Sequence, residues 1–356
     1  MYDLNELGWN DFFAKSFLPY EADGYSPARV VLEHRRAYRV YAESGELLAE
    51  ITGRVRYEAV TRAELPAVGD WVAITGYPDE KRATIHAILP RRSKFSRKAA
   101  GRNTQEQIVA ANVDTVFVVV GLDNDYNLRR VERYLVAAFE SGANPVIILN
   151  KLDLCDEIDS KLAEVAVVAA GVPVHAISSI TQSGLEQINQ YIKKGLTVAF
   201  LGSSGVGKST LINRLVGKDI QKVREVREDD SRGRHTTTHR ELIALPSGGL
   251  LIDTPGMREL HLWESDGGLS ETFEDVESFA AQCHFTNCRH QNEPGCAIKA
   301  GLESGTLDTA RYESYIKLQK ELAFLETRQD IQAQFERKQR DKKINKAFNR
   351  MKPKRG

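Results

Sequence analysis

The central part of the chain alternates short apolar runs with amphipathic segments. Four apolar runs have the length and composition of strands that are buried on both faces: 113–120, 145–149, 172–177 and 197–201. Apolar residues recur at helical spacing in three further segments: 129–140, 158–170 and 185–192. Alternating strands and helices predict an α/β domain with a mostly parallel sheet, whose ligand binds beyond the carboxyl ends of the strands.

The flanks of this central part have a different pattern. Before residue 100, turn signals separate short runs in which apolar and polar residues alternate. These runs predict a small antiparallel β-barrel, with strands near 29–32, 37–41, 47–51 and 70–74. A leader, 1–25, precedes the barrel, and the sequence assigns no role to its aromatic residues. We therefore expect three domains, which are a leader plus barrel in 1–100, the α/β domain in 101–262 and a C-terminal domain in 263–356.

Charge is segregated along the chain rather than absent. The 356 residues include 49 Lys or Arg and 49 Asp or Glu, so the formal net charge is +0. The segment 337–355 nevertheless carries ten basic residues against Asp341 alone. Such a tail suits binding to a phosphate backbone, and a solvated extension of a helix is the alternative. A second basic segment, 91–98, links the barrel to the α/β domain.

The composition argues against a membrane protein and against a secreted one. No run of eighteen apolar residues occurs, so we expect no membrane span. The chain has only four Cys residues and no N-terminal hydrophobic signal, which makes a disulfide scaffold improbable. We expect a monomeric cytoplasmic protein.

A phosphate-binding loop follows the last apolar run. Residues 202–209 read Gly-Ser-Ser-Gly-Val-Gly-Lys-Ser and fit the pattern G-x-x-x-x-G-K-S between a strand and a helix. The glycines permit a tight turn that points backbone N–H groups at phosphate, while Lys208 would stabilise the β- and γ-phosphates during catalysis and Ser209 would bind Mg²⁺. The expected nucleotide contacts are Gly202, Ser203, Ser204, Gly205, Val206, Gly207, Lys208, Ser209 and Thr210.

A second phosphate motif follows the apolar run 249–252. It is Asp253-Thr254-Pro255-Gly256, an ordinary turn sequence by itself. After a phosphate loop, however, a carboxylate at the tip of a buried strand is well placed to hold the Mg²⁺ shell. We therefore expect Asp253 near Mg²⁺ and the Gly256 N–H near the γ-phosphate.

A base-reading motif ends the run 145–149. It is Asn150-Lys151-Leu152-Asp153, in which the Asp153 carboxylate can accept two hydrogen bonds that guanine offers and adenine does not. Ser178 ends the next run, where a backbone N–H could meet the guanine O6. We therefore expect Asn150, Lys151, Asp153 and Ser178 to bind the base of GTP.

The order of these motifs is rotated. In a conventional G domain the base-reading motif follows both phosphate motifs, whereas here 150–153 precedes 202–209. Strand ends still converge on one crevice, so a circular permutation keeps the site intact. The Asp253 loop then leads directly into the C-terminal domain, which ties that domain mechanically to the nucleotide state.

Three of the four cysteines cluster near the start of the C-terminal domain. Their pattern is Cys283-x₄-Cys288-x-His290-x₅-Cys296. Three thiolates and one imidazole satisfy tetrahedral Zn²⁺ with no open position, which indicates one structural zinc ion. His284 is a competing imidazole, although side chains adjacent in the chain diverge, and three unrelated reduced thiols are the alternative to a metal site.

The rotated motif order, the segment 233–238 (Gly-Arg-His-Thr-Thr-Thr) and the cysteine cluster resemble the RsgA (YjeQ/YloQ) family of bacterial small-subunit biogenesis GTPases. The resemblance covers nearly the whole chain. It implies an N-terminal OB-fold, a circularly permuted P-loop GTPase domain and a C-terminal zinc-binding α-helical domain. It also implies GTP and GDP as ligands, Mg²⁺ bound with GTP, and the small (30S) ribosomal subunit and its rRNA as partners, with no DNA.

The resemblance also suggests roles for individual residues. The spacing of His290 matches the family, and one threonine of 236–238 is expected to close over Mg²⁺, with Thr237 as the candidate. An OB-fold binds oligonucleotides through basic and aromatic residues. Those available on the barrel are Arg35, Arg36, Arg39, Arg54, Arg56, Tyr38, Tyr41 and Tyr57.

Hydrolysis by the isolated protein should be slow. The residue after Gly256 is Met257, whose thioether cannot orient a water molecule by strong hydrogen bonding. His235 is the catalytic candidate for placing the water, and an exposed loop imidazole is the alternative interpretation. A partner that orders this segment would accelerate the reaction.

The sequence therefore predicts a GTP hydrolase that binds rRNA during late maturation of the small subunit. Stimulated by the subunit, it would time its own release or that of a factor. Two other classes stay open. An RNA-binding scaffold with GTP as a structural ligand would turn over almost no GTP even with subunits, whereas a metabolic kinase or ATPase would have no use for Asn150 and Asp153.

Overall fold

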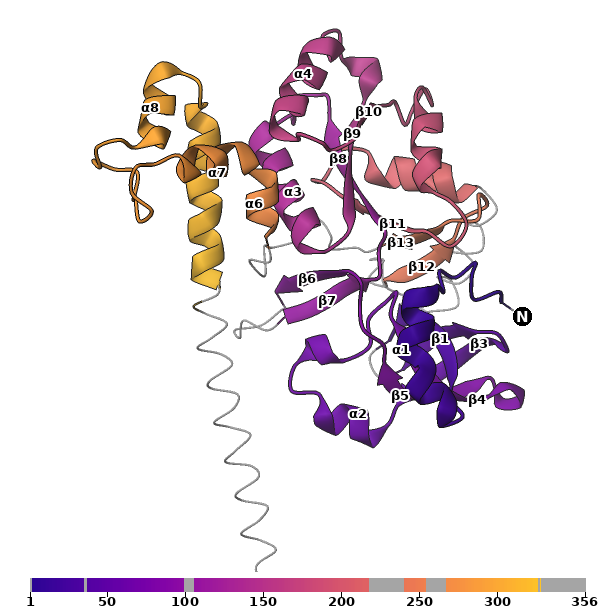
Figure 1. Cartoon of the computed structure of the whole chain (residues 1–356). Helices are drawn as coiled ribbons and strands as arrows, with labels where there is room; N and C mark the ends of the chain where they lie inside the picture. The colour runs from indigo at the N-terminus through magenta and orange to yellow at the C-terminus, as the bar shows by residue number, and fades with distance from the viewer. Residues whose placement is uncertain are drawn as a thin grey trace, which may run out of the picture.

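The computed structural model describes residues 2–34, 37–98, 106–217, 240–253, 267–325 and 327. Within these ranges, an N-terminal barrel, a central sheet covered by helices and a helical C-terminal module follow one another along the chain. The barrel lies below the central sheet, and the C-terminal module projects from its side (Figure 1). This arrangement confirms the predicted fold class.

The central sheet contains the buried strands that the apolar runs predict. Its order is β10-β9-β8-β11-β13-β12, with bounds β8 Thr115–Gly121, β9 Asn144–Asn150, β10 Val174–Ala176, β11 Thr197–Leu201, β12 Glu241–Ala244 and β13 Leu250–Asp253. Neighbouring strands are parallel except β12 and β13, which are antiparallel. Because β8 is buried along its whole length, it reads as a continuous apolar run.

Helices cover both faces of this sheet. They are α3 Leu128–Glu140, α4 Ile158–Val168 and a helix over 208–217 that follows the phosphate loop. The predicted helix at 185–192 is instead a 3₁₀ helix, Leu185–Tyr191. It has no side-chain cap and starts after Gly184, whose φ of 76° is left-handed, so the chain there forms a tight connection to β11 rather than a full α-helix.

The N-terminal barrel has five strands, and sequence patterns indicated four of them. Its strands are β1 Ser26–Glu33, β2 Tyr38–Ala42, β3 Gly45–Ile51, β4 Trp71–Tyr77 and β5 Arg82–Ile88. They pair in the order β1-β2-β3-β5-β4, and β4 returns to β1 to close the barrel. A short helix, α2 Gly53–Glu58, leaves β3.

The leader packs against the outside of the barrel, on the opposite face of its strands from the barrel core. Helix α1, Asp11–Ala22, begins at Asn10, whose side chain accepts hydrogen bonds from the N–H groups of Phe12 and Phe13. Phe13 and Phe17 are four residues apart and thus lie on one face of the helix, where both are buried. Trp9 contacts the buried Trp71 edge-on, with ring centroids 4.7 Å apart. The aromatic residues of the leader therefore seal one side of the barrel.

In the predicted basic linker, 91–98, Arg91, Arg92 and Lys94 form ion pairs within the protein, although Arg92 is itself exposed. The linker contains the first strand of a hairpin, in which β6 Lys94–Lys98 pairs with β7 Glu106–Ala111. Arg91 forms an ion pair with the fully buried Asp70, with 2.6 Å between Nη2 and Oδ2, and Phe95 is also buried. Arg91 thus joins the hairpin to the barrel, and its charge is not offered to a partner.

A buried arginine ties four parts of the chain together. Arg29 on β1 donates hydrogen bonds to the carbonyls of Leu7, Gly69 and Asn112 and, at 2.9 Å, to the Thr197 hydroxyl at the start of β11. Its burial lowers the pKa of the guanidinium to about 10. Since its direct acceptors are neutral, Arg29 fixes the leader and barrel against the central sheet by hydrogen bonding.

The barrel and the central sheet also share hydrogen-bonded strands. β1 pairs with β12 at Leu32 and Glu241, so both parts form one eleven-stranded sheet. Arg240, which precedes β12, is buried and lies 3.3 Å from the Glu33 carboxylate of β1. The strand that follows the predicted threonine segment is therefore anchored to the barrel.

The C-terminal module packs on α3. It contains α6 Gly268–Thr272, α7 Glu274–Ala281, α8 Ala297–Ser304 and a helix over 309–325. Gly268 lets α6 approach closely, because a Cβ there would lie 2.6 Å from the Val136 carbonyl oxygen. Leu318 and Leu322 are buried in the module core. Among the helices in the described ranges, none has the length and apolar character to cross a membrane.

Candidate nucleotide and metal sites

The phosphate loop joins β11 to the helix over 208–217. Its glycines Gly202, Gly205 and Gly207 have φ values of 144°, 84° and 94°, which disfavour residues with a Cβ. Side chains would also collide here, at Gly202 with the Val119 carbonyl and at Gly207 with the Asn150 amide. The spacing of the glycines is therefore required by the fold of the loop itself.

Lys208 lies over this loop. Its Nζ donates hydrogen bonds of 2.5 Å to the carbonyl oxygens of Gly202 and Ser203. Ser209 and Thr210 are exposed in the first turn of the helix, where backbone N–H groups favour an anion. The loop thus gathers a cation, hydroxyls and a helix N-terminus at the carboxyl end of β11.

The sequence did not reveal an ionic contact behind the loop. The Ser203 hydroxyl donates to Asp125 Oδ2 at 2.8 Å and accepts from Arg130 Nη1 at 3.0 Å. Arg130 also bonds Asp125 at 2.5 Å, and this bond holds the pKa of the carboxyl below its usual range. Asp125 follows β8 at the same sheet edge as the loop, which is the signal that could have identified it.

Asn150 connects the base-reading loop to the phosphate loop. It is fully buried at the end of β9, and its Nδ2 donates to the Val206 carbonyl at 2.8 Å. Its Oδ1 accepts from the Ser179 N–H at 3.0 Å. Lys151 has a left-handed φ of 69° and forms an ion pair with Asp123, which lowers the pKa of that carboxyl. The two predicted motifs therefore meet despite their rotated order.

Ser178 contacts Asp153 through its side chain. The Ser178 hydroxyl donates to Asp153 Oδ1 and accepts from the Thr181 N–H at 3.1 Å. The Ser178 N–H itself donates to the Ser183 carbonyl at 2.9 Å, so it is occupied within the loop. Ser178 thus orients the Asp153 carboxylate, which is a different contribution from the backbone contact that the sequence suggested.

The second phosphate motif is described only in part. Asp253 ends β13, which pairs in parallel with β11, so this carboxylate lies at the same sheet edge as the phosphate loop. The other predicted residues of this region lie outside the described ranges: His235, Thr236, Thr237, Thr238, Gly256 and Met257.

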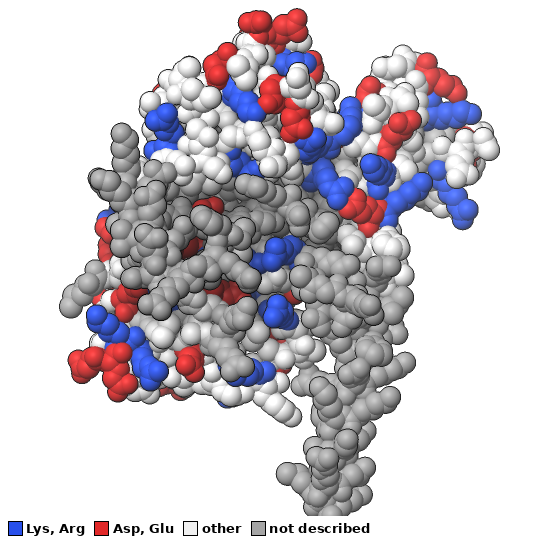
Figure 2. Space-filling model, turned by 180° about the vertical axis from the view of Figure 1, so that it is seen from behind, with Lys and Arg blue, Asp and Glu red and all other residues white. Residues whose placement is uncertain are grey.

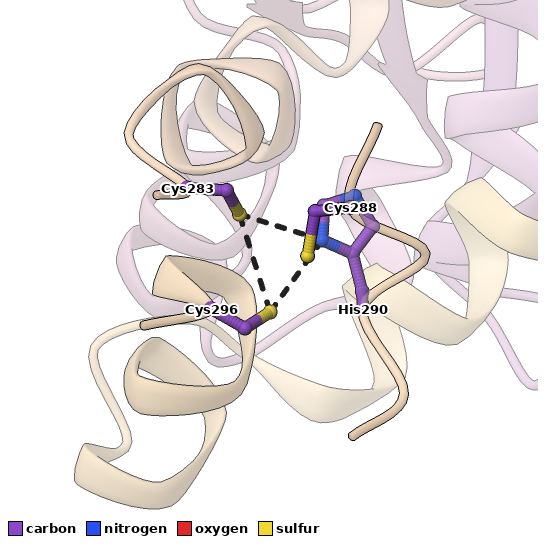
Figure 3. A group of neighbouring side chains, drawn as sticks. All are labelled: Cys283, Cys288, His290 and Cys296. Atoms are coloured by element: carbon purple, nitrogen blue, oxygen red, sulfur yellow. Dashed lines mark hydrogen bonds between the residues drawn. The ribbon is translucent and has the colours of Figure 1, made fainter. Parts of the chain in front are cut away.

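The cysteine cluster forms one compact group (Figure 3). The ligand atoms of Cys283, Cys288, His290 and Cys296 all lie within 4.8 Å of one another. Cys283 Sγ is 4.0 Å from Cys296 Sγ, and each of these sulfurs is 3.5 Å from His290 Nδ1. With metal–sulfur bonds of about 2.3 Å, a tetrahedral zinc site has sulfurs roughly 3.8 Å apart, so this donor set fits Zn²⁺. The ring of His284 instead packs edge-on against Phe285.

Local contacts hold the four ligands in place. The Glu293 carboxylate accepts hydrogen bonds from the N–H groups of Arg289, Gln291 and Asn292, closing the loop that carries His290. The backbone N–H of Glu293 itself and these three N–H groups together lower the pKa of the Glu293 carboxyl. Cys296 is the N-cap of α8, and its sulfur accepts the Lys299 N–H at 3.5 Å, so the start of the helix fixes the position of this side chain. The sequence did not identify Glu293.

The barrel residues expected to contact RNA are only partly available. Tyr38 is buried in the barrel core, because its position on β2 faces inward, and the expectation that it stacks on bases is therefore wrong. Tyr41 stacks on Tyr2 with centroids 4.2 Å apart. Tyr57 on α2 is 80% exposed and remains a candidate. Arg39 pairs with Glu46 and Arg54 with Glu58, whereas Arg35 and Arg36 lie outside the described ranges.

Comparisons with known proteins agree with this geometry. Residues 88–263 match the model of the RsgA GTPase family. The chain is 50% identical over 336 residues to the small ribosomal subunit biogenesis GTPase RsgA of Opitutus terrae, covering 92% of both chains. It is 46% identical to RsgA 2 of Lactiplantibacillus plantarum, covering 92% of this chain and 94% of that protein. The structure of YjeQ from Thermotoga maritima superposes with a TM-score of 0.62 at 30% identity, covering 84% and 99% of the two chains.

A second similar solved structure is that of YloQ, a circularly permuted GTPase. It superposes with a TM-score of 0.60 at 27% sequence identity. The match covers 84% of this chain and 95% of YloQ.

Proposed function

Because this chain belongs to the RsgA GTPase family, we propose that it hydrolyses GTP while assisting late maturation of the small (30S) ribosomal subunit. The observation that supports this most directly is the Asn150 amide, which joins the base-reading loop to Val206 of the phosphate loop. That contact brings the two motifs together although their order along the chain is permuted. The proposed domains are 1–100, 101–262 and 263–356.

The proposed site divides its work among a few side chains. Asp153, oriented by Ser178, reads guanine, while the loop N–H groups and Lys208 hold the phosphates. Ser209 and Asp253 would hold Mg²⁺, which neutralises developing charge on the phosphates during transfer. Thr237 would complete this shell in the GTP state, and the Gly256 N–H would meet the γ-phosphate. His235, or a group of the subunit, would place the attacking water.

Contacts to rRNA would come mainly from the ends of the chain. On the face seen in Figure 2, Lys and Arg side chains gather where the C-terminal module meets the rest of the molecule, with Asp and Glu among them. Part of that charge is already paired, as in Arg133 with Glu321 and Arg129 with Asp308. The unbalanced charge is that of 337–355, so we assign phosphate-backbone binding to this tail and base stacking to Tyr57.

The proposed function also implies two metal ions and a location in the cell. One structural Zn²⁺ would be held by the three cysteines and His290, which offer no open ligand position. Mg²⁺ would enter with GTP. The protein would work as a monomer in the cytoplasm, where small subunits mature, with GTP, GDP and rRNA as its ligands and no contact with DNA.

Steady-state GTP hydrolysis with and without purified small subunits tests the proposed function. We expect a slow rate for the isolated protein and a large stimulation by small subunits that falls as salt is raised, because phosphate contacts release counterions. His235→Ala should remove most of the stimulated rate. Tight GTP binding with no stimulation at any salt concentration would contradict the proposal and favour the scaffold alternative.

Asp153→Asn should change which nucleotide is preferred. The variant amide can donate to the 2-oxo group of xanthine but cannot accept both guanine protons, so preference should move from GTP to XTP by about 10⁴-fold. Competition binding of GDP and XDP measures the shift. Asp156→Asn, an exposed carboxylate three residues along the chain, serves as the matched control and should leave the preference unchanged. Unaltered GTP preference in Asp153→Asn would exclude this residue as the base reader.

A further inference from the structure

Helix α3 carries two sets of polar contacts near its N-terminus. Arg130 contacts the phosphate loop, whereas Arg129, Glu132 and Arg133 contact the C-terminal module. The proposed function assigns no role to these residues. The helix thus bridges the nucleotide site and the metal-binding module in one rigid element.

The contact with the phosphate loop is a closed triangle. Arg130 Nη1 bonds both Asp125 and the Ser203 hydroxyl, and that hydroxyl donates back to Asp125. The carbonyl of the same residue, Ser203, accepts a hydrogen bond from Lys208 Nζ. Ser203 is therefore held by its side chain from α3 and by its backbone from the phosphate-binding lysine. Removing one corner of the triangle would free the loop to change conformation.

The contact with the C-terminal module is more deeply buried. Glu132 is fully buried and accepts from Arg311 Nη1 at 2.9 Å. Arg311 also bonds Asp275 at 2.6 Å and the Thr272 carbonyl at 2.9 Å, so it holds α6 and α7 against α3. Arg129 pairs with the same Glu132 carboxylate from within α3, so two arginines and one buried carboxylate form a network that fixes the position of the module on α3.

An outer ion pair and an apolar contact complete this docking. Arg133 forms two hydrogen bonds with the Glu321 carboxylate, at 2.8 and 2.5 Å. One turn further along the helix, Val136 packs into the apolar core of the module. Arg133 is only partly buried, so its pair can be broken without leaving a charge inside the protein.

We propose that Arg130 is a positioning residue for the phosphate loop, and that α3 couples docking of the C-terminal module to nucleotide affinity. Arg130 holds Ser203 in the phosphate-binding conformation, so less ordering remains to be done when nucleotide binds. A shift of α3 caused by the module moves Arg130 and thereby alters the affinity for nucleotide. Coupling of this kind is reciprocal, so bound nucleotide must also stabilise the docked module.

Release of a fluorescent GDP analogue from the full-length protein tests the positioning role. Arg130→Met should speed release by about tenfold, and Ser203→Ala by a similar factor, because each removes a charge-assisted or bridging hydrogen bond. The double variant should release GDP no faster than either single variant. Arg130→Lys, which keeps a positively charged donor nitrogen, should release GDP more slowly than Arg130→Met. Arg214→Met, an exposed arginine on the helix after the loop, is the matched control and should release GDP like wild type.

Breaking the outer ion pair tests the coupling. Arg133→Met should speed GDP release about threefold in the wild-type background and have no effect in the Arg130→Met background. Unchanged release in both Arg130→Met and Ser203→Ala would overturn the positioning role. Equal effects of Arg133→Met in the two backgrounds, or none in either, would overturn the coupling. The inference rests on the proposed nucleotide site, and wild-type protein that binds no GDP would refute that site instead.

Discussion

Replacing Lys208 by alanine should lower the rate of GTP hydrolysis by about 10²- to 10³-fold, the cost typical of losing one charge-stabilising donor. The ammonium group lies 2.5 Å from the carbonyl oxygens of Gly202 and Ser203, which places it over the phosphate loop. In the nucleotide complex it would exchange these neutral acceptors for phosphate oxygens, whose charge grows on the leaving side during transfer. Single-turnover hydrolysis at saturating GTP separates this loss from weaker binding.

The control for this variant is Lys15→Ala. Lys15 is an exposed lysine on α1, so its removal makes the same change of charge and should leave intrinsic hydrolysis unaltered. If Lys208→Ala hydrolyses GTP within a factor of about three of wild type, the loop is not the catalytic phosphate site, since a main-chain cradle alone does not supply the charge of the lysine.

Removing the metal from the C-terminal module should abolish its folded structure. Binding of structural zinc contributes about 10–16 kcal/mol in small zinc domains, which exceeds the stability that a short helical module can supply by itself. A strong chelator, or the substitution Cys288→Ala, should therefore reduce the helical circular dichroism signal and cause rapid proteolysis within 283–325. Cys288 is the better choice for substitution, because Cys296 also begins α8 and its loss would weaken that helix directly.

Elemental analysis checks the metal itself. Wild-type protein and the control Cys155→Ala should each hold one zinc ion per chain, because Cys155 lies apart from the cluster, whereas Cys288→Ala should hold far less. A metal-free wild-type protein with the same unfolding profile before and after chelation would show that the four side chains meet for another reason.

The parts of the site that depend on local backbone geometry could be predicted from the sequence. The positive φ values of Gly202, Gly205 and Gly207 allow few residues other than glycine, so the phosphate loop could be recognised as a sequence motif. The four metal ligands are likewise close in sequence, and the structure brings them together. Buried strands such as β8 are apolar throughout and were equally clear.

Contacts between distant segments could not be predicted in this way. Arg130 and Ser203 are 73 residues apart, and Arg29 and Thr197 are 168 apart, so only the tertiary fold brings each pair together. The side of the barrel that Tyr38 faces depends on strand register, and a one-residue shift would reverse it. The role of the leader could not be predicted, because the same aromatic residues on one face of a short helix can be buried in the protein or can bind a partner. Only the contact with Trp71 distinguishes the two.

Synthesis of this chain delivers the two halves of the nucleotide site at different times. β1 and β8 are both made before residue 197, and in the finished sheet they flank β11, β13 and β12. With neighbouring strands about 4.8 Å apart, these later strands occupy a span of roughly 19 Å whose two borders already exist. Because N-terminal units fold first during synthesis, the loop over 150–153, which we propose reads guanine, is made before the phosphate loop over 202–209. We therefore expect a newly made molecule to hold nucleotide only after its last strands have joined the barrel to the sheet.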